Sequence, residues 1–226
     1  MLPGPSALST DFTAMTLTST QYYDERVAAG IWRIPDLDKP VPAEGDPARA
    51  AADMQDDFLK GVASALIKQA AKGELIGPQW NGTATGVLAQ ILLVSVLSRM
   101  AFRGQAERFA GDEAGLALAL KFYDSPARKS ASPFERMWAY HPFMRAEDRE
   151  VQEMAVDLYS ELDRELLAAN CGCGKAMLKL AFDTHAVLKK WAGTFPHLNE
   201  FKSRDTDEDE HAWMMSAAGK AFVRQA

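Results

Sequence analysis

The chain has 226 residues, of which 47% are hydrophobic and 25% are charged, and its formal net charge at pH 7 is -6. This length and apolar content suffice for one substantial core and do not require a second domain. An acidic balance disfavours a nucleic-acid-binding surface, which needs clustered lysine and arginine, so we expect no nucleic-acid partner. Two cysteines cannot make a disulfide framework, and a reducing, cytoplasmic location is the simpler expectation.

The first 46 residues are rich in proline, glycine, serine and threonine, and we expect them to form an extended arm. They lack the basic start and the continuous apolar run of a secretory signal, while their serine and threonine content leaves an organellar destination open. Residues 47–226 are expected to form a single helical domain. It begins with Asp46 as an N-cap and Pro47 at the first helical position.

Apolar residues recur at helical spacing through most of this domain. The pattern predicts helices over residues 47–72, 83–102, 107–122, 134–140, 147–169, 174–192 and 206–221. The second of these is apolar on almost every face, which places it in the centre of the fold. Its apolar run, residues 86–97, is about half of the roughly 20 residues that cross a membrane, so no membrane span is expected. Short loops and the lack of period-two alternation predict an all-α fold of about seven antiparallel helices.

Short motifs run through this helical region in a recognisable order. They are GEL at 73–75, ILLVSVLSRMAFRG at 91–104, Asp112, HPFMRAEDREVQE at 141–153, His185, GTFPHLN at 193–199 and Arg204. Together they resemble the bacterial family called domain of unknown function 924, over about residues 50–213. The resemblance implies a tetratricopeptide-like arrangement of helix pairs and carries no established activity.

The chain departs from this family pattern at several polar positions and resembles a diverged member. Ser95, Val96 and Met100 stand where the family has Asp, Gln and Asn. Arg145 stands at the place of a histidine, and Thr194 and Leu198 replace two arginines. Because so many polar groups differ, chemistry shared by the whole family is not expected to carry over intact.

Six polar residues are candidates for ligand binding: Arg99, Arg103, Glu147, His185, His197 and Asn199. Arg99 and Arg103 lie four residues apart and therefore share one helix face. They either pair with an acid, such as Glu147 or Asp148, or hold a carboxylate or phosphate in a fork.

The two histidines and the asparagine each allow two interpretations. His185 lies at the edge of an apolar stripe and is either a hydrogen-bonded, partly buried histidine or an acid, base or anion donor. His197 and Asn199 flank the turn after Gly193, and either shape that turn or contact a ligand.

Metal and cofactor motifs are not evident. Cys171 and Cys173 have no second cysteine pair to complete a zinc site, and the turn that contains them reads as a glycine-rich helix connection. The acidic run at 205–210 lacks the alternating ligands and the glycine of an EF-hand. Without a phosphate loop, a nucleophile elbow or an HExxH pair, we expect no metal and no cofactor.

The sequence therefore predicts a soluble binding or interaction module that recognises an acidic peptide or a small anionic ligand. One alternative is an enzyme in which His185 or His197 acts as a general base and an arginine stabilises developing negative charge. Another alternative is a structural subunit whose N-terminal arm wraps a partner protein.

Overall fold

The computed structural model describes residues 60–61, 63–103, 105–172 and 174–225, and the regular structure in these ranges is helical throughout. The predicted all-α class is therefore confirmed. The predicted N-terminal arm and the predicted helix start at Asp46 lie outside the described residues. The first described helix ends at residue 71, as the sequence predicts, and Gly73 follows with a φ of 69°, in the left-handed region that suits glycine.

A long apolar helical segment follows the short helix α3 (Pro78–Asn81) and consists of α4 (Ala84–Leu92), the π-helix η1 (Leu93–Leu97) and α5 (Ser98–Ala101). Thr83 caps it, because its Oγ1 accepts the Gly86 N–H at 3.0 Å. By length and composition residues 84–101 could cross a membrane, but 61% of this stretch is buried inside the protein. It packs as a core helix between two hydrophobic clusters.

The π-helix changes the geometry of the end of this segment. Within it the Ser95 hydroxyl donates to the Ile91 carbonyl at 2.7 Å, and just after it Ser98 donates to the Val94 carbonyl at 2.6 Å. These bonds satisfy buried hydroxyls along a backbone whose regular α-helical pattern is interrupted. Arg99 follows immediately in α5, so its direction depends on the π turn.

The helix α6 (Asp112–Asp124) packs directly on this π-helix after the 3-10 helix η2 (Ala106–Phe109). A Cβ added at Gly111 would lie only 2.7 Å from the Val94 Cβ, and one at Gly115 would lie 3.1 Å from Val94 Cγ2. The missing side chains therefore allow the start of α6 to approach η1 closely. This contact brings Asp112 next to Arg99.

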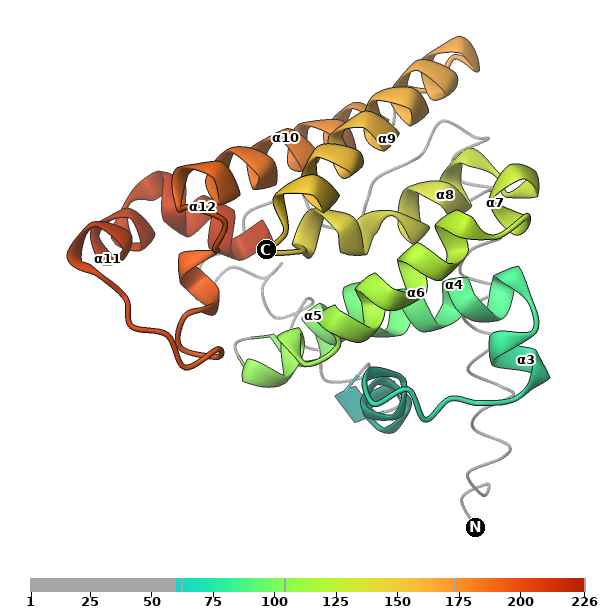
Figure 1. Ribbon diagram of the computed structural model, residues 1–226, viewed down its shortest axis with the longest axis horizontal. Helices are drawn as coiled ribbons and strands as arrows, with labels where there is room; N and C mark the ends of the chain where they lie inside the picture. Colours follow the sequence, from blue (N-terminus) through green and yellow to red (C-terminus); the bar gives the residue numbers. More distant parts are fainter. Residues whose placement is uncertain (1–59, 62, 104, 173, 226) are drawn as a thin grey trace, which may run out of the picture.

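The centre of the chain supplies most of the main core. After α7 (Ala127–Ser130) come α8 (Pro133–Ala139), the 3-10 helix η3 (His141–Arg145), α9 (Arg149–Ala168) and α10 (Gly174–Lys190). Ser132 and Glu135 form a capping box at the start of α8, and Asp148 caps α9. Figure 1 shows α9 and α10 side by side, with α8, α6 and α4 following them across the molecule.

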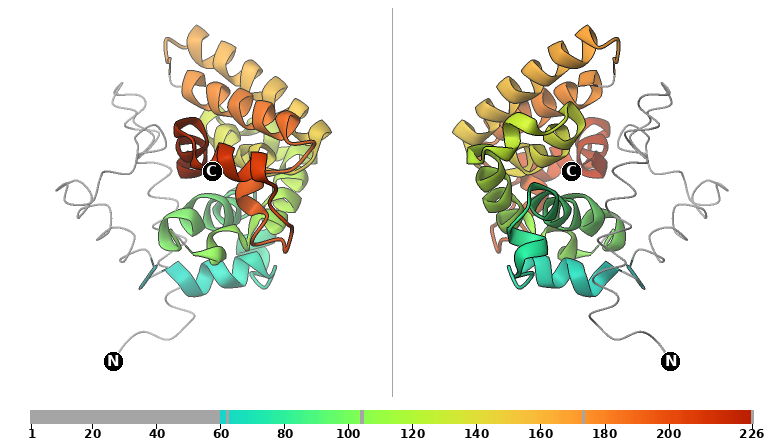
Figure 2. Two further views of the ribbon diagram at one scale, coloured as in Figure 1. Left: turned by 90° about the vertical axis from the view of Figure 1, so that its left-hand side faces the viewer. Right: turned by 90° about the vertical axis from the view of Figure 1, so that its right-hand side faces the viewer.

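The C-terminal part forms a smaller cluster at one end of α10. It contains the 3-10 helix η4 (Pro196–Leu198), α11 (Glu208–Met215) and α12 (Ala217–Gln225). Leu188, Phe195, Leu198 and Phe222 are its buried hydrophobic residues. The side views in Figure 2 show α9 and α10 at one end of the described molecule and the first described helix at the other.

Several sequence predictions need correction. The helix predicted over 107–122 is broken by Gly111 into η2 and α6, and the last predicted helix is split at Ser216 into α11 and α12. The count of about seven helices is not confirmed, since short helices such as α3 and α7 add to it within the described ranges. Cys171 is disulfide-bonded, contrary to the expectation of reduced cysteines.

Candidate functional site

A small pocket lies where α5, α6, η3, α10, η4 and α12 meet, and it encloses about 230 Å³ of space between atoms. Its lining combines charged groups with apolar and aromatic ones: Arg99, Phe109, Asp112, Met144, Arg145, Thr184, Phe195, His197, Leu198 and Phe222. These residues come from both halves of the described chain. The pocket therefore depends on the tertiary fold and on no single helix.

Arg99 and Asp112 form the central ion pair of the pocket. The Arg99 Nη2 donates to both carboxylate oxygens of Asp112, at 2.8 and 3.0 Å, and its Nη1 donates to the Arg108 carbonyl at 3.0 Å. The side chains are 9% and 20% exposed, respectively. The sequence-based prediction of an ion pair for this arginine is correct, but its partner is Asp112 and not Glu147 or Asp148.

Two further arginines add positive charge around this pair. Arg145 is buried in the lining, and burial, with repulsion from Arg99, lowers its pKa to about 9. Arg108 flanks the pocket, and burial, with repulsion from Arg99 and Arg103, lowers its pKa to about 10. Among the described residues, these three guanidiniums lie near one carboxylate, that of Asp112. Guanidiniums that lie close together at a partly buried site favour negative charge beside them.

His197 is the polar group that η4 contributes to the lining. Burial, together with repulsion from Arg145, Arg108 and Arg99, lowers its pKa to about 3. The imidazole is therefore neutral at neutral pH, and its buried Nδ1 has no hydrogen-bond partner among the described residues. A neutral imidazole can donate one hydrogen bond and accept another, which suits a polar ligand beside the arginines.

Aromatic rings surround the charged groups. The Arg108 and Arg99 guanidiniums lie 4.8 and 5.4 Å from the centre of the Phe109 ring. The His197 ring lies 5.5 to 5.7 Å from Phe109, Phe195 and Phe222. These rings shield the arginines from water, which strengthens their interaction with any anion that enters.

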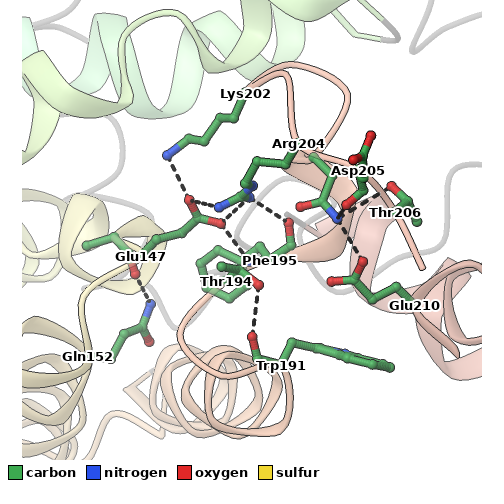
Figure 3. A network of polar contacts seen from close by, with 12 residues as sticks. Glu147, Gln152, Trp191, Thr194, Phe195, Lys202, Arg204, Asp205, Thr206 and Glu210 are labelled. Atoms are coloured by element: carbon green, nitrogen blue, oxygen red, sulfur yellow. Dashed lines mark hydrogen bonds and ion pairs between the residues drawn. The ribbon is translucent and has the colours of Figure 1, made fainter.

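Glu147 holds the segment that carries Phe195 and His197. Its carboxylate accepts the Phe195 N–H at 2.6 Å, two nitrogens of Arg204 at 2.7 and 3.1 Å, and Lys202 Nζ at 2.8 Å (Figure 3). Burial opposes its charged form, but the bonds from Arg204, Lys202 and Phe195 outweigh this effect and lower its pKa. Glu147 therefore positions a wall of the pocket and does not line it.

Asn199 has a similar supporting role in the same loop. It is buried, and its Nδ2 donates to Glu210 Oε2 at 2.9 Å, the Asp205 carbonyl at 3.3 Å and Thr206 Oγ1 at 3.4 Å. These bonds tie the turn after η4 to the start of α11. The asparagine therefore shapes the turn, which was one of its two predicted roles.

The remaining candidates lie outside the pocket lining. Arg103 is partly buried near the end of α5, and its charge contributes to the lowered pKa of Arg108. His185 is partly buried on α10, directly after the lining residue Thr184, and its buried Nδ1 has no hydrogen-bond partner. Of the six candidates, the structure thus brings Arg99 and His197 together in the pocket.

Sequence reasoning did not single out Arg108, Asp112, Arg145 or Thr184 as site residues. For Arg145 a signal exists, because this arginine directly follows the largely apolar and aromatic stretch 137–144, and the structure buries every residue from 137 to 146. A charged residue in such surroundings is rarely a plain surface residue. Thr184 looks like an ordinary member of an apolar stripe, and Arg108 lies in a segment without clear periodicity, so neither has a comparable signal.

Two further observations on the described residues concern metal binding and a second pocket. In the described ranges no group of three or more His, Cys, Asp and Glu side chains could hold a metal ion. A more open pocket of about 470 Å³ lies between the start of α4 and the end of α6, with Thr83, Lys121 and Ser125 among its lining residues. It has one lysine and no buried charged group, so it is chemically less specific than the arginine pocket.

Comparisons with known proteins agree with this picture. A solved structure of a protein of unknown function from Agrobacterium tumefaciens superposes with a TM-score of 0.64 and 24% identity, over 89% of this chain and 97% of that chain. At that identity the likeness shows the fold alone. No curated protein matches the chain. The family model described as bacterial protein of unknown function (DUF924) matches residues 48–218, which includes most of the pocket and ends before Phe222. The chain belongs to the DUF924 family.

Proposed function

We propose that this protein is a binding module that holds a small oxyanion in the arginine pocket. The observation that carries the proposal is the meeting of Arg99, Arg108 and Arg145 around a single carboxylate, Asp112, in a chain whose net charge is -6. Guanidiniums bind carboxylates and phosphates through paired N–H groups. An anion in the pocket would offset the repulsion that lowers the pKa of Arg145 and Arg108.

The size of the pocket favours a small ligand over an acidic peptide. The pocket holds about 230 Å³ of space between atoms, part of which is open to solvent, so a tetrahedral or planar oxyanion would enter only if side chains of the lining moved. A peptide tail would require the loop around η4 to move away, against the contacts of Glu147.

The catalytic alternative has less support. It requires His185 and His197 within reach of one reacting atom, and the lining includes His197 without His185. The pKa of about 3 also makes the His197 imidazole a weak base at neutral pH. The alternative of a structural subunit depends on the N-terminal arm, which lies outside the described residues.

The wider properties of the module are also proposals. The pairing of α9 with α10 through a short connection supports a tetratricopeptide-like arrangement and a role in protein interaction. The acidic net charge supports a soluble protein with no nucleic-acid partner, whereas the disulfide at Cys171 does not support the cytoplasmic location that we keep as a proposal. The burial of the apolar segment 84–101 supports the lack of a membrane span.

A thermal-shift titration of the full chain with phosphate, sulfate and small carboxylates tests the proposal. A ligand present at 100 times its Kd stabilises the folded state by about 2.7 kcal/mol, which is a readily measured rise in Tm. Arg145→Met and Arg108→Met should reduce this rise. Arg149→Met is the matched control, because Arg149 is an exposed arginine on α9 whose side chain is 69% accessible.

Two results would overturn the proposal. One is that no oxyanion raises the Tm of the wild-type chain. The other is that one anion raises the Tm of Arg145→Met, Arg108→Met and Arg149→Met by as much as it raises the Tm of the wild type. Arg108→Met protects the test against misfolding, because Arg108 is less buried than Arg145.

A further inference from the structure

The hydrogen-bonding groups of the pocket are not all donors. Asp112 lines the pocket, and an ionised carboxylate can only accept hydrogen bonds. Its two oxygens accept from one nitrogen of Arg99, at 2.8 and 3.0 Å. A carboxylate offers about four lone-pair positions, so Asp112 retains acceptor capacity beyond this ion pair.

Thr184 offers a second acceptor. Its Oγ1 lies 3.0 Å from the carbonyl oxygens of both Leu180 and Ala181, so its only proton is used inside α10. The hydroxyl oxygen keeps lone pairs, and Thr184 belongs to the pocket lining. The pocket therefore combines arginine donors with two groups that can accept a hydrogen bond from the ligand.

This combination distinguishes between anions of the same size and shape. A fully deprotonated oxyanion among the arginines would place a negative oxygen against the Asp112 carboxylate with no proton between them. An anion that still carries an O–H group can donate that proton to Asp112 or Thr184 while its other oxygens accept from Arg99 and Arg145. A hydrogen bond to a charged group changes affinity by about tenfold or more, which is enough to decide between such ligands.

We infer that the pocket selects oxyanions that carry an O–H group beside their charge, and that Asp112 is the residue that recognises this proton. Among tetrahedral anions these are orthophosphate and the monoprotonated form of phosphate monoesters. Sulfate, which has no proton at neutral pH, is discriminated against. This inference rests on the proposed oxyanion-binding function and specifies its ligand class.

Calorimetric titration of the full chain with orthophosphate and sulfate, at pH 7.5 and equal ionic strength, tests the inference without any substitution. Orthophosphate should bind about tenfold more tightly than sulfate, the ratio that one additional hydrogen bond to a charged group produces. Methyl phosphate separates a free phosphate from an ester as the ligand. Because its second pKa is about 6, it should bind like orthophosphate at pH 5.5 and more weakly at pH 7.5.

Asp112→Asn assigns the selectivity to one residue, because an amide donates as well as accepts. In this variant the affinity for sulfate should rise to within about threefold of that for orthophosphate, since the amide is uncharged and can donate to a sulfate oxygen. Asp124→Asn, at the other end of α6, is the matched control and should keep the wild-type ratio. A melting curve confirms that each variant is folded, and if Asp112→Asn unfolds, the wild-type comparison decides alone.

The outcomes separate this inference from the proposed function. Equal affinities of the wild type for orthophosphate and sulfate, both weakened by Arg145→Met, would overturn the selectivity and leave the oxyanion site intact. An unchanged ratio in folded Asp112→Asn would overturn the role of Asp112. If neither anion binds, the proposed function itself is overturned.

Discussion

Glu147 and Arg204 are 57 positions apart in the chain and form a two-bond ion pair, with Arg204 Nη2 2.7 Å from Oε1 and Nη1 3.1 Å from Oε2 of the carboxylate. The pair joins the start of α9 to the loop that follows η4. The same carboxylate also accepts the Phe195 N–H, so one side chain fixes the backbone on which His197 is mounted.

Glu147→Gln should therefore destabilise the protein by about 2 kcal/mol, because the ion pairs are lost in a site that is only 10% exposed. Urea unfolding of the wild type and the variant gives this difference. Glu153→Gln is the control, because the ion pair of Glu153 with Arg149 is largely exposed. This substitution should change the free energy of unfolding by less than about 0.5 kcal/mol. Equal effects of the two substitutions would contradict the anchoring role of Glu147.

The lowered pKa of His197 predicts a loss of stability in mild acid. An unfolded imidazole takes up a proton below about pH 6.5, whereas the folded protein resists protonation down to about pH 3. The unfolded state thus binds more protons in this window, so the contribution of His197 is complete above pH 6.5 and declines as the pH falls. His197 contributes at most about 1.4 kcal/mol per pH unit to the slope of the unfolding free energy against pH.

Unfolding free energies measured between pH 7 and pH 4 should accordingly vary less with pH in His197→Gln than in the wild type. His211→Gln, which changes an exposed histidine on α11, is expected to keep the wild-type slope. His141 retains part of the pH dependence in every variant, because burial lowers its pKa well below 6.5. A wild-type slope in His197→Gln would show that His197 titrates normally in the folded protein.

Gly111→Ala should disturb both the core and the pocket. The new Cβ would lie 2.7 Å from the Val94 Cβ, so α6 must move away from η1, at a cost of about 1–3 kcal/mol. That movement would also separate Asp112 from Arg99 and weaken anion binding. In Gly172→Ala the new Cβ meets no atom within 4 Å, so the free energy of unfolding should change by less than about 1 kcal/mol. Thermal melts of both variants, with and without phosphate, provide the comparison.

Asn199→Ala separates a structural role from a ligand-binding one. Removal of the amide leaves its acceptors at Asp205, Thr206 and Glu210 without this donor, which should cost about 1–3 kcal/mol. Anion affinity measured well below the Tm should stay within about threefold of the wild type, since Asn199 does not line the pocket. A large loss of affinity in a variant of normal stability would show that Asn199 contacts the ligand.

Local signals in the sequence predict the long helices well. The Thr83 cap, the helix end before Gly73, and the extents of α9 and α10 all follow from side-chain chemistry and apolar spacing within a few residues. The breaks at Gly111 and Ser216 were missed for a physical reason. The first depends on the close approach of Val94 from another helix, and the second falls inside an otherwise continuous helical pattern.

The site could be predicted only in part, because its charges come from separate segments. Arg99 and His197 stood out as polar residues next to helix ends, and both line the pocket. The pairing of Arg99 with Asp112 depends on how α6 docks on η1, which no local pattern specifies. Arg145 replaces a histidine of the family pattern, and its meaning is clear only once η3 is seen to be buried.

The π-helix η1 rotates α5 around the helix axis relative to the position that a regular continuation of α4 would give it. Residues up to Leu92 have the angular phase of α4, whereas residues from Ser98 have one displaced from it. If residues 93–97 were wound as a regular α-helix, everything after them would turn by about 100° around the helix axis, the angle of one residue. Arg99 would then point away from Asp112 although every core residue of α4 kept its place. The extra residue of the π-helix therefore sets the rotation of α5 relative to α4. It allows α4 to face the core while Arg99 faces Asp112 in the charged pocket.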